Sequence, residues 1–111
     1  MASISVIMPV YNAQATVVRA LQSLIGQSFG DWECICVDDG STDGSAELLD
    51  EAARNDGRIR VVHQANAGVS AARNAALAQA SGEYVTFLDA DDEFEPFAFA
   101  RMVEALGADA S

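Results

Sequence analysis

The sequence has 111 residues, a formal net charge of −11 and 50% hydrophobic residues, which indicates one folded domain rather than a disordered chain. The sequence has 17 acidic residues and six basic ones, all of them arginine. Because this excess of negative charge repels other anions, nucleic acids and anionic membrane surfaces are not expected as partners. A Walker-type phosphate loop, a kinase and a lysine nucleophile are excluded because each of them needs a lysine, and the chain has none.

The predicted elements alternate between strands and helices. Apolar, β-branched runs predict four strands, at residues 3–9, 32–38, 59–63 and 84–88. Apolar residues at helical spacing predict helices over residues 13–27, from the turn at 40–43 to about 55, over 69–80, and from 96 to about 106. Short connections and nearly continuous apolar strands indicate a three-layer α/β/α domain with a mostly parallel sheet.

The sequence ends shortly after the last predicted helix, where the alternation would place another strand. We therefore expect a truncated domain, whose open sheet edge and uncovered helix faces favour self-association. Cys34 and Cys36 lie in a predicted strand and are interpreted as buried apolar side chains, not as a zinc or disulfide site. No basic leader or long apolar run occurs, so we expect a cytoplasmic protein, with any membrane association through a missing C-terminal part.

Polar residues follow the predicted strands, and the carboxyl ends of parallel strands form the ligand-binding edge of such a sheet. Asp38 and Asp39 end the second strand, where a carboxylate can accept a hydrogen bond from a nucleobase or a ribose. A turn and helix cap explains this pair equally well. Gly68 and Arg73 open the third helix, where N–H groups and a guanidinium favour a diphosphate, although a packing helix with a surface arginine is the alternative.

Five acidic residues occur within the seven positions 89–95. Carboxylates this dense repel one another unless they are solvated or bridged by a cation, and Mg²⁺ or Mn²⁺ takes one or two carboxylates together with phosphate oxygens. An acidic turn before a helix N-terminus explains the same pattern. Seven of the 17 acidic residues are expected beside one crevice: Asp38, Asp39, Asp89, Asp91, Asp92, Glu93 and Glu95.

Four fragments, each at the end of a predicted strand or just after it, resemble the family 2 glycosyltransferases, which have the GT-A nucleotide-sugar-binding fold. They are VIMPVYN (6–12), VDDGSTDGS (37–45), NAGVSAARN (66–74) and FLDADD (87–92). The likeness covers nearly all of residues 1–111. These residues would form the donor-binding half of a catalytic domain, without its acceptor-binding half.

The resemblance implies a role for each matching position at the base end of the site. Pro9, Val10 and Tyr11 would line the nucleobase pocket. Asp39 would accept the N–H of the base, and Asp38 would support the site or the ribose.

The diphosphate end follows in the same way. Gly68 and Arg73 would border the nucleotide and its diphosphate. Asp89-Ala90-Asp91 matches the DXD motif of the family. Asp91 would be the direct ligand of Mn²⁺ or Mg²⁺, and Asp89 would contact ribose or metal-bound water.

The implied reaction is metal-dependent transfer of a sugar from a nucleotide-diphosphate donor, expected to be UDP-linked, to a saccharide or lipid-linked acceptor with inversion. The catalytic base is expected beyond Ser111, because Glu93 and Glu95 follow the motif too closely. We therefore expect this chain to bind donor nucleotide without transferring sugar.

Three other functions fit these residues less well. A metal-dependent phosphohydrolase would use Asp89 and Asp91 but usually needs a lysine. A nucleotidyltransferase would need a basic, glycine-rich loop at residues 11–13, where the sequence reads YNA. A non-catalytic interaction module would keep the fold alone, and the intact carboxylates argue against it.

Overall fold

The computed structural model describes residues 3–110, and the side chains of residues 3–106. Four strands alternate with four helices, as predicted: β1 (Ile4–Val10), α1 (Val17–Ile25), β2 (Trp32–Asp39), α2 (Ser45–Asn55), β3 (Ile59–Gln64), α3 (Val69–Leu77), β4 (Tyr84–Phe87) and α4 (Ala98–Ala110). None of the helices in this described part is long and apolar enough to cross a membrane.

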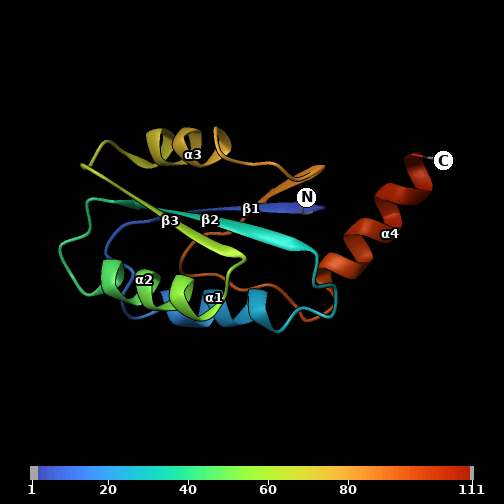
Figure 1. The fold of residues 1–111 in the computed structure, drawn as a ribbon, viewed down its shortest axis with the longest axis horizontal. Helices are drawn as coiled ribbons and strands as arrows, with labels where there is room; N and C mark the ends of the chain where they lie inside the picture. Colours follow the sequence, from blue (N-terminus) through green and yellow to red (C-terminus); the bar gives the residue numbers. More distant parts are fainter. Residues whose placement is uncertain (1–2, 111) are drawn as a thin grey trace.

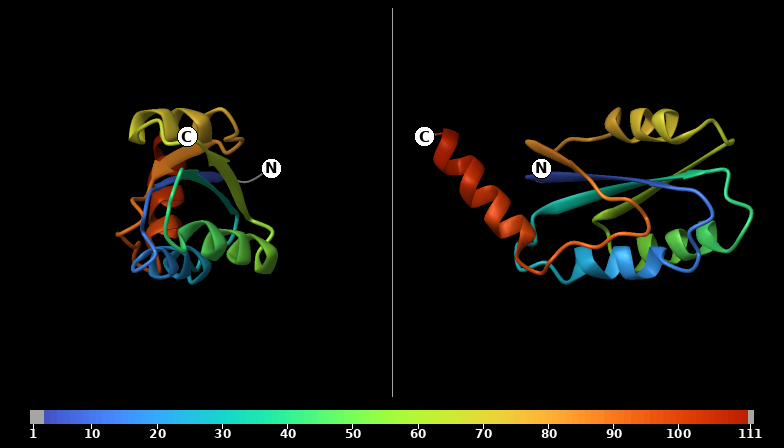
Figure 2. Two further views of the ribbon diagram at one scale, coloured as in Figure 1. Left: turned by 90° about the vertical axis from the view of Figure 1, so that its left-hand side faces the viewer. Right: turned by 180° about the vertical axis from the view of Figure 1, so that it is seen from behind.

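The strands form one parallel sheet in the order β3-β2-β1-β4. Helices α1 and α2 cover one face and α3 covers the other, while α4 extends away from one end of the sheet (Figures 1 and 2). The predicted three-layer α/β/α architecture is thereby confirmed. After β3 the chain crosses through α3 to β4, on the far side of β1. This reversal is the point at which open parallel sheets bind ligands.

Strand β2 is buried along its whole length because helices cover both of its faces. Cys34 and Cys36 belong to the core on the α1 and α2 side, whereas Ile35 and Val37 pack with α3. Both cysteines are free and buried, as predicted. Because side chains alternate along a strand, Asp38 and Asp39 point to opposite faces at its end.

Two helices are shorter than predicted. Helix α1 begins at Val17 rather than at Ala13, since residues 13–16 form a turn whose first N–H, that of Ala13, donates to Ser45 Oγ at 2.8 Å. Helix α3 ends at Leu77, after which Gln79 and Ala80 continue with tighter hydrogen bonds to residues three positions back.

Glu33 joins several segments at the amino end of the sheet. Its Oε2 accepts hydrogen bonds from Ser5 Oγ at 2.5 Å and from the N–H of Ser81 at 2.7 Å. Its Oε1 accepts one from Arg60 Nη2 at 2.7 Å. Burial alone would raise the pKa of Glu33, but these hydrogen bonds outweigh it and lower the pKa to about 2. The ionised carboxylate therefore stabilises the fold.

Replacing this carboxylate tests that conclusion. Glu33→Gln is expected to lower the free energy of unfolding at pH 7 by about 1–3 kcal/mol, because the amide loses the negative charge and its nitrogen cannot accept the hydrogen bonds of the carboxylate oxygen it replaces. The carboxylate's contribution is present above pH 4.5 and is lost as the pH falls through about 2. Urea unfolding at pH 7 and at pH 3 should show a larger difference at pH 7. Glu51→Gln, an exposed change on α2, is the matched control, and equal midpoints for both variants would refute the role of Glu33.

Candidate functional site

A cavity of about 450 Å³ opens at the carboxyl ends of β1, β2 and β4. The structure brings seven of the nine predicted site residues to its wall: Pro9, Val10, Tyr11, Asp39, Gly68, Asp89 and Asp91. Asp38 and Arg73 do not line it. Asn66 and Ala72, which belong to the fragment 66–74 but were given no role of their own, line it as well, and so does Thr16. Thr16 lies in the turn before α1 and Ala72 is a small residue inside α3, so neither gave a signal for a binding site in the sequence.

The loop after β1 forms one wall of the cavity. Tyr11 is 54% exposed there, with Pro9 and Val10 beside it. Asn12 has a φ of 48°, and its N–H donates to Ser41 Oγ at 3.0 Å. Its side-chain oxygen accepts the N–H of Thr42 at 2.8 Å. The two loops after β1 and β2 therefore hold each other in place.

Asp39 occupies the floor of the cavity with its acceptor positions in use. Oδ1 accepts from Gln64 Nε2 at 3.0 Å and from the N–H of Ala67 at 2.8 Å. Oδ2 accepts from the N–H of Gly68 at 3.0 Å and, at 3.4 Å, from Asn66 Nδ2. The Gln64 and backbone hydrogen bonds lower the pKa of Asp39 against the opposing effect of burial. The residue is an ionised acceptor that already holds the segment leading into α3.

This segment passes close to Gly40. Gly40 has a φ of +73°, and a Cβ at this position would lie 2.7 Å from the backbone nitrogen of Asn66. A side chain here would thus meet both backbone strain and a backbone clash. Gly68 also has a positive φ, +100°, where it leads the chain into α3, but open space surrounds it.

Asp38 lies behind the cavity wall and holds the neighbouring turn. It is buried, and its Oδ1 accepts the N–H of Ser41 at 3.0 Å. Its Oδ2 lies 2.9 Å from His63 Nδ1. These contacts match the turn interpretation of Asp38, and its predicted role at the ribose stays a prediction.

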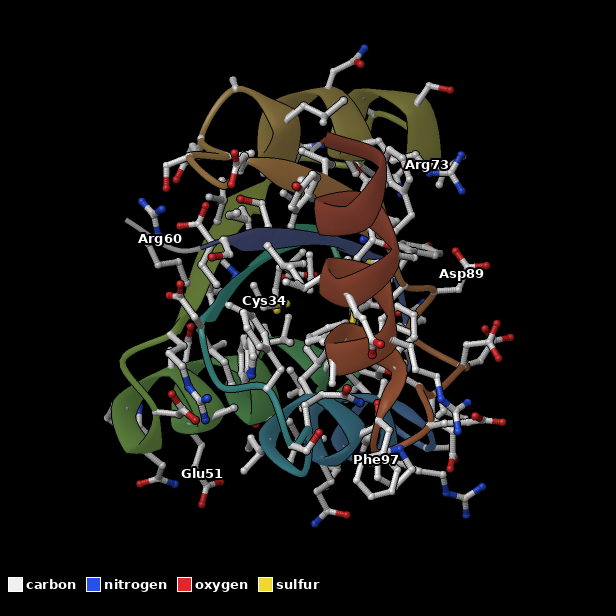
Figure 3. All side chains as sticks on the ribbon, turned by 90° about the vertical axis from the view of Figure 1, so that its right-hand side faces the viewer. Cys34, Glu51, Arg60, Arg73, Asp89 and Phe97 are labelled. Carbon is white, nitrogen blue, oxygen red and sulfur yellow. The ribbon has the colours of Figure 1, made fainter. Side chains whose placement is uncertain are left out.

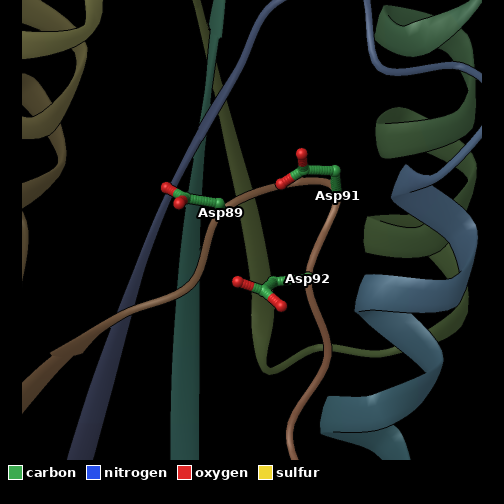
Figure 4. A group of neighbouring side chains, drawn as sticks. All are labelled: Asp89, Asp91 and Asp92. Carbon is green, nitrogen blue, oxygen red and sulfur yellow. The ribbon is translucent and has the colours of Figure 1, made fainter.

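Three carboxylates project from the loop after β4 (Figure 4). Asp89, Asp91 and Asp92 each offer an oxygen within 4.8 Å of the others, and all three are exposed. Such oxygen donors are the ligands that Mn²⁺ and Mg²⁺ prefer, and two of these residues face the cavity. The residues present therefore fit a divalent cation.

Arg73 stands beside this loop from α3, on the same side of the molecule as Asp89 (Figure 3). Its Nη2 lies 3.7 Å from Asp89 Oδ1, and its guanidinium carbon lies 5.8 Å from the ring centre of Phe87. The side chain is 41% exposed. Arg73 is therefore a cation at the rim of the site rather than in its wall.

Only three of the seven acidic residues expected beside the crevice line the cavity: Asp39, Asp89 and Asp91. The loop turns away after Asp92. Glu93 then pairs with Arg19 at 3.8 Å, and Glu95 with Arg101 at 3.2 Å.

Two polar side chains, Ser23 in α1 and Gln27 just after it, anchor the segment that follows the acidic loop, and sequence reasoning missed these contacts. Gln27 Nε2 donates to the carbonyl of Glu95 at 2.6 Å, and Gln27 Oε1 accepts the N–H of Phe99 at 3.1 Å. Ser23 Oγ accepts the N–H of Phe94 at 3.1 Å. These partners lie about 70 positions apart in sequence, and no local pattern pairs them.

Comparison with known proteins places the chain in a family. Residues 5–111 match the model of the family described as Glycosyl transferase family 2, and the chain belongs to it. A relative in Bacillus subtilis (strain 168), named uncharacterized glycosyltransferase EpsJ, is 42% identical over 101 residues, which are 91% of this chain and 29% of the relative. The chain thus spans about 30% of the length of such relatives.

Two solved structures share the fold, which confirms the GT-A assignment. S. aureus TarS 1–349 in complex with UDP matches with a TM-score of 0.89 and 32% identity, over 97% of this chain and 32% of that one. The mannosyltransferase PcManGT from Pyrobaculum calidifontis, in complex with GDP-Man and Mn²⁺, matches with a TM-score of 0.77 and 29% identity. The match covers 83% of this chain and 28% of the PcManGT chain.

The close approach at Gly40 gives a test of how the site is built. Gly40→Ala is expected to lower the free energy of unfolding by about 1–3 kcal/mol, because Cβ meets strain and the Asn66 backbone. Gly57→Ala is the matched control, since a Cβ there has no heavy atom within 4 Å. Chemical unfolding of both variants measures the difference. Equal stability of the two would contradict the packing of these loops.

Proposed function

We propose that this chain binds the nucleotide diphosphate of a sugar donor, with a UDP-sugar as the donor, as the donor-binding half of a glycosyltransferase. The supporting observation is the cavity, which gathers an exposed aromatic ring, a buried carboxylate and two exposed carboxylates at the switch point of the sheet. The similarity to TarS in complex with UDP supports the choice of nucleotide. GDP is the alternative to be tested beside it, because the PcManGT structure contains GDP-Man.

The base end of the proposed site uses β1 and β2. The Tyr11 ring lies exposed at the cavity, where stacking on a nucleobase contributes about 1–3 kcal/mol. Asp39 would accept the N–H of the base. Because its acceptor positions are in use, we propose that the base replaces its longest contact, the 3.4 Å hydrogen bond from Asn66 Nδ2.

The diphosphate end uses the acidic loop and α3. Asp91 would hold Mn²⁺ or Mg²⁺ directly, with Asp89 contacting the ribose or metal-bound water. The bound cation would neutralise the negative charge that develops on the leaving diphosphate. From the rim, Arg73 can reach a phosphate as a two-pronged donor, and the first-turn N–H groups of α3 have no partner within the helix.

For the whole enzyme we propose transfer with inversion to a saccharide or lipid-linked acceptor. Inversion needs a base that deprotonates the acceptor hydroxyl. Glu93 and Glu95 do not line the cavity and are paired with arginines, which supports a base beyond Ser111. This chain would then bind donor without transferring sugar. The free thiols of Cys34 and Cys36 agree with a cytoplasmic location, which we also propose.

Metal-dependent nucleotide binding tests the proposal. Isothermal titration with UDP should give binding in the presence of Mn²⁺ and at least about tenfold weaker binding without it, because the carboxylates otherwise repel the diphosphate. Asp91→Asn should remove the dependence on Mn²⁺. A parallel titration with GDP decides between the two nucleotides.

Glu95→Gln is the matched control for this experiment. It removes an exposed carboxylate from the same segment, but one that is paired with Arg101 outside the cavity. Its Mn²⁺-dependent binding should equal that of the unchanged protein. Absence of binding to either nucleotide by a folded chain would rule out the proposed function.

We also propose that the chain self-associates through β4. Among the described residues 3–110 this edge strand pairs only with β1, and it exposes Val85 by 44% and Phe87 by 49%. Val85→Lys should shift the protein toward monomer in sedimentation, because a charged edge resists strand pairing. Val18→Lys, at a comparably exposed valine on α1, should leave the association unchanged. A monomer at all concentrations before mutation would contradict this proposal.

A further inference from the structure

His63 belongs to β3 and lies just behind the cavity wall, between two carboxylates. Its Nδ1 is 2.9 Å from Asp38 Oδ2, and its Nε2 is 2.9 Å from Asp50 Oδ1. A neutral imidazole has only one N–H, and ionised carboxylates only accept hydrogen bonds. Both contacts can therefore be hydrogen bonds only when the ring carries two protons. The geometry describes an imidazolium that joins α2 to the carboxyl end of β2.

The charged groups that face the ring come from the two elements packed against β3. They are Asp38 on β2 and Asp50 on α2, while Asp39 points to the opposite face of the sheet. Within residues 3–106, neither Asp38 nor Asp50 has another ion-pair partner. Hydrogen bonds from the ring to Asp38 and then to Asp50 raise the pKa of His63 above 6.5, against the effect of burial.

A short series of hydrogen bonds connects the ring to the cavity. Asp38, held by His63 through one oxygen, accepts the N–H of Ser41 through the other at 3.0 Å. Ser41 Oγ accepts the N–H of Asn12 at 3.0 Å. Asn12 lines the cavity next to Tyr11. This series is the route by which a change at His63 would reach the wall where the nucleotide is proposed to bind.

We propose that His63 is a positioning residue for nucleotide binding, which in its doubly protonated form clamps the Asp38–Ser41 turn and the loop after β1 in the binding shape. This inference rests on the proposed function. The clamp is complete below the ordinary pKa of histidine and loses one of its two hydrogen bonds as the pH rises through the raised pKa. Nucleotide affinity then falls with rising pH over the same range.

The protonation can be measured directly. His63 is the only histidine in the sequence, so its imidazole protons form a single set of NMR signals. Their titration should give a pKa above 6.5. Asp50→Asn should shift that pKa downward, because it removes one of the two carboxylates. A pKa at or below 6.5 in the unchanged protein would overturn the clamp.

The effect on binding separates positioning from a purely structural role. UDP affinity in the presence of Mn²⁺ would be measured from pH 5.5 to 8.5 for the unchanged protein and for His63→Gln. Gln keeps a donor but does not titrate. The unchanged protein should bind about fivefold tighter than the variant at the acid end, and the ratio should approach one at the alkaline end. UDP itself titrates in this pH range, but its titration affects both affinities equally and cancels in their ratio.

The outcomes distinguish this inference from the proposed function. If the ratio is the same at every pH while both proteins bind UDP, His63 does not position the site and the proposed function stands. If the folded, unchanged protein binds UDP at no pH, the proposed function fails and the role of His63 fails with it. A ratio that falls toward one with rising pH, together with a raised pKa, supports both.

Discussion

The Asp39 carboxylate connects the end of the most buried strand to the start of α3. The strand β2 delivers it to the binding edge, and the backbone N–H groups of Ala67 and Gly68 donate to its two oxygens. The buried carboxylate requires hydrogen-bond donors, and the two N–H groups require an acceptor because they lie outside any helix or strand. The same bonds place Asn66 against Gly40 and close one wall of the cavity. One ionised side chain thus fixes this wall of the site.

The charge of the cavity has a direct consequence for its ligand. Three exposed carboxylates with oxygens within 4.8 Å repel one another by about 1 kcal/mol per pair in water, a repulsion that solvation makes tolerable. An anionic diphosphate would meet the same repulsion as it displaces that water. Arg73, 3.7 Å from Asp89 at the rim, offsets only one of these charges. A divalent cation resolves the conflict, since its charge attracts both the loop and the ligand.

Much of the fold could be predicted because its signals are local. Apolar β-branched runs located the strands, and apolar residues at helical spacing located the helices. Side chains alternate between the two faces along β2, which is sufficient to send Asp38 and Asp39 to opposite faces. The contacts of these residues could not be predicted in the same way. Asp50 meets His63 only because α2 packs on β3 at a particular register, and Gln27 meets Glu95 only because the chain returns to α1 after the acidic loop. The loop conformation also decides that Glu93 and Glu95 leave the cavity, which counting acidic residues overlooked.

The helix α3 shows why two carboxylates of one strand matter to the site. It is short and buries only the small side chains Ala72 and Ala76, so apolar burial contributes less to its placement than it does for α1. Polar contacts from β2 add to the packing of these alanines on the sheet. Asp39 binds the backbone just before its first residue, and Glu33 binds Ser81 shortly after its last. A helix held at both ends by ionised carboxylates keeps its N-terminus aimed at the cavity without a large apolar face. The wall proposed to face the phosphates therefore depends on electrostatics at both ends of β2 as well as on the packing of α3 against the sheet.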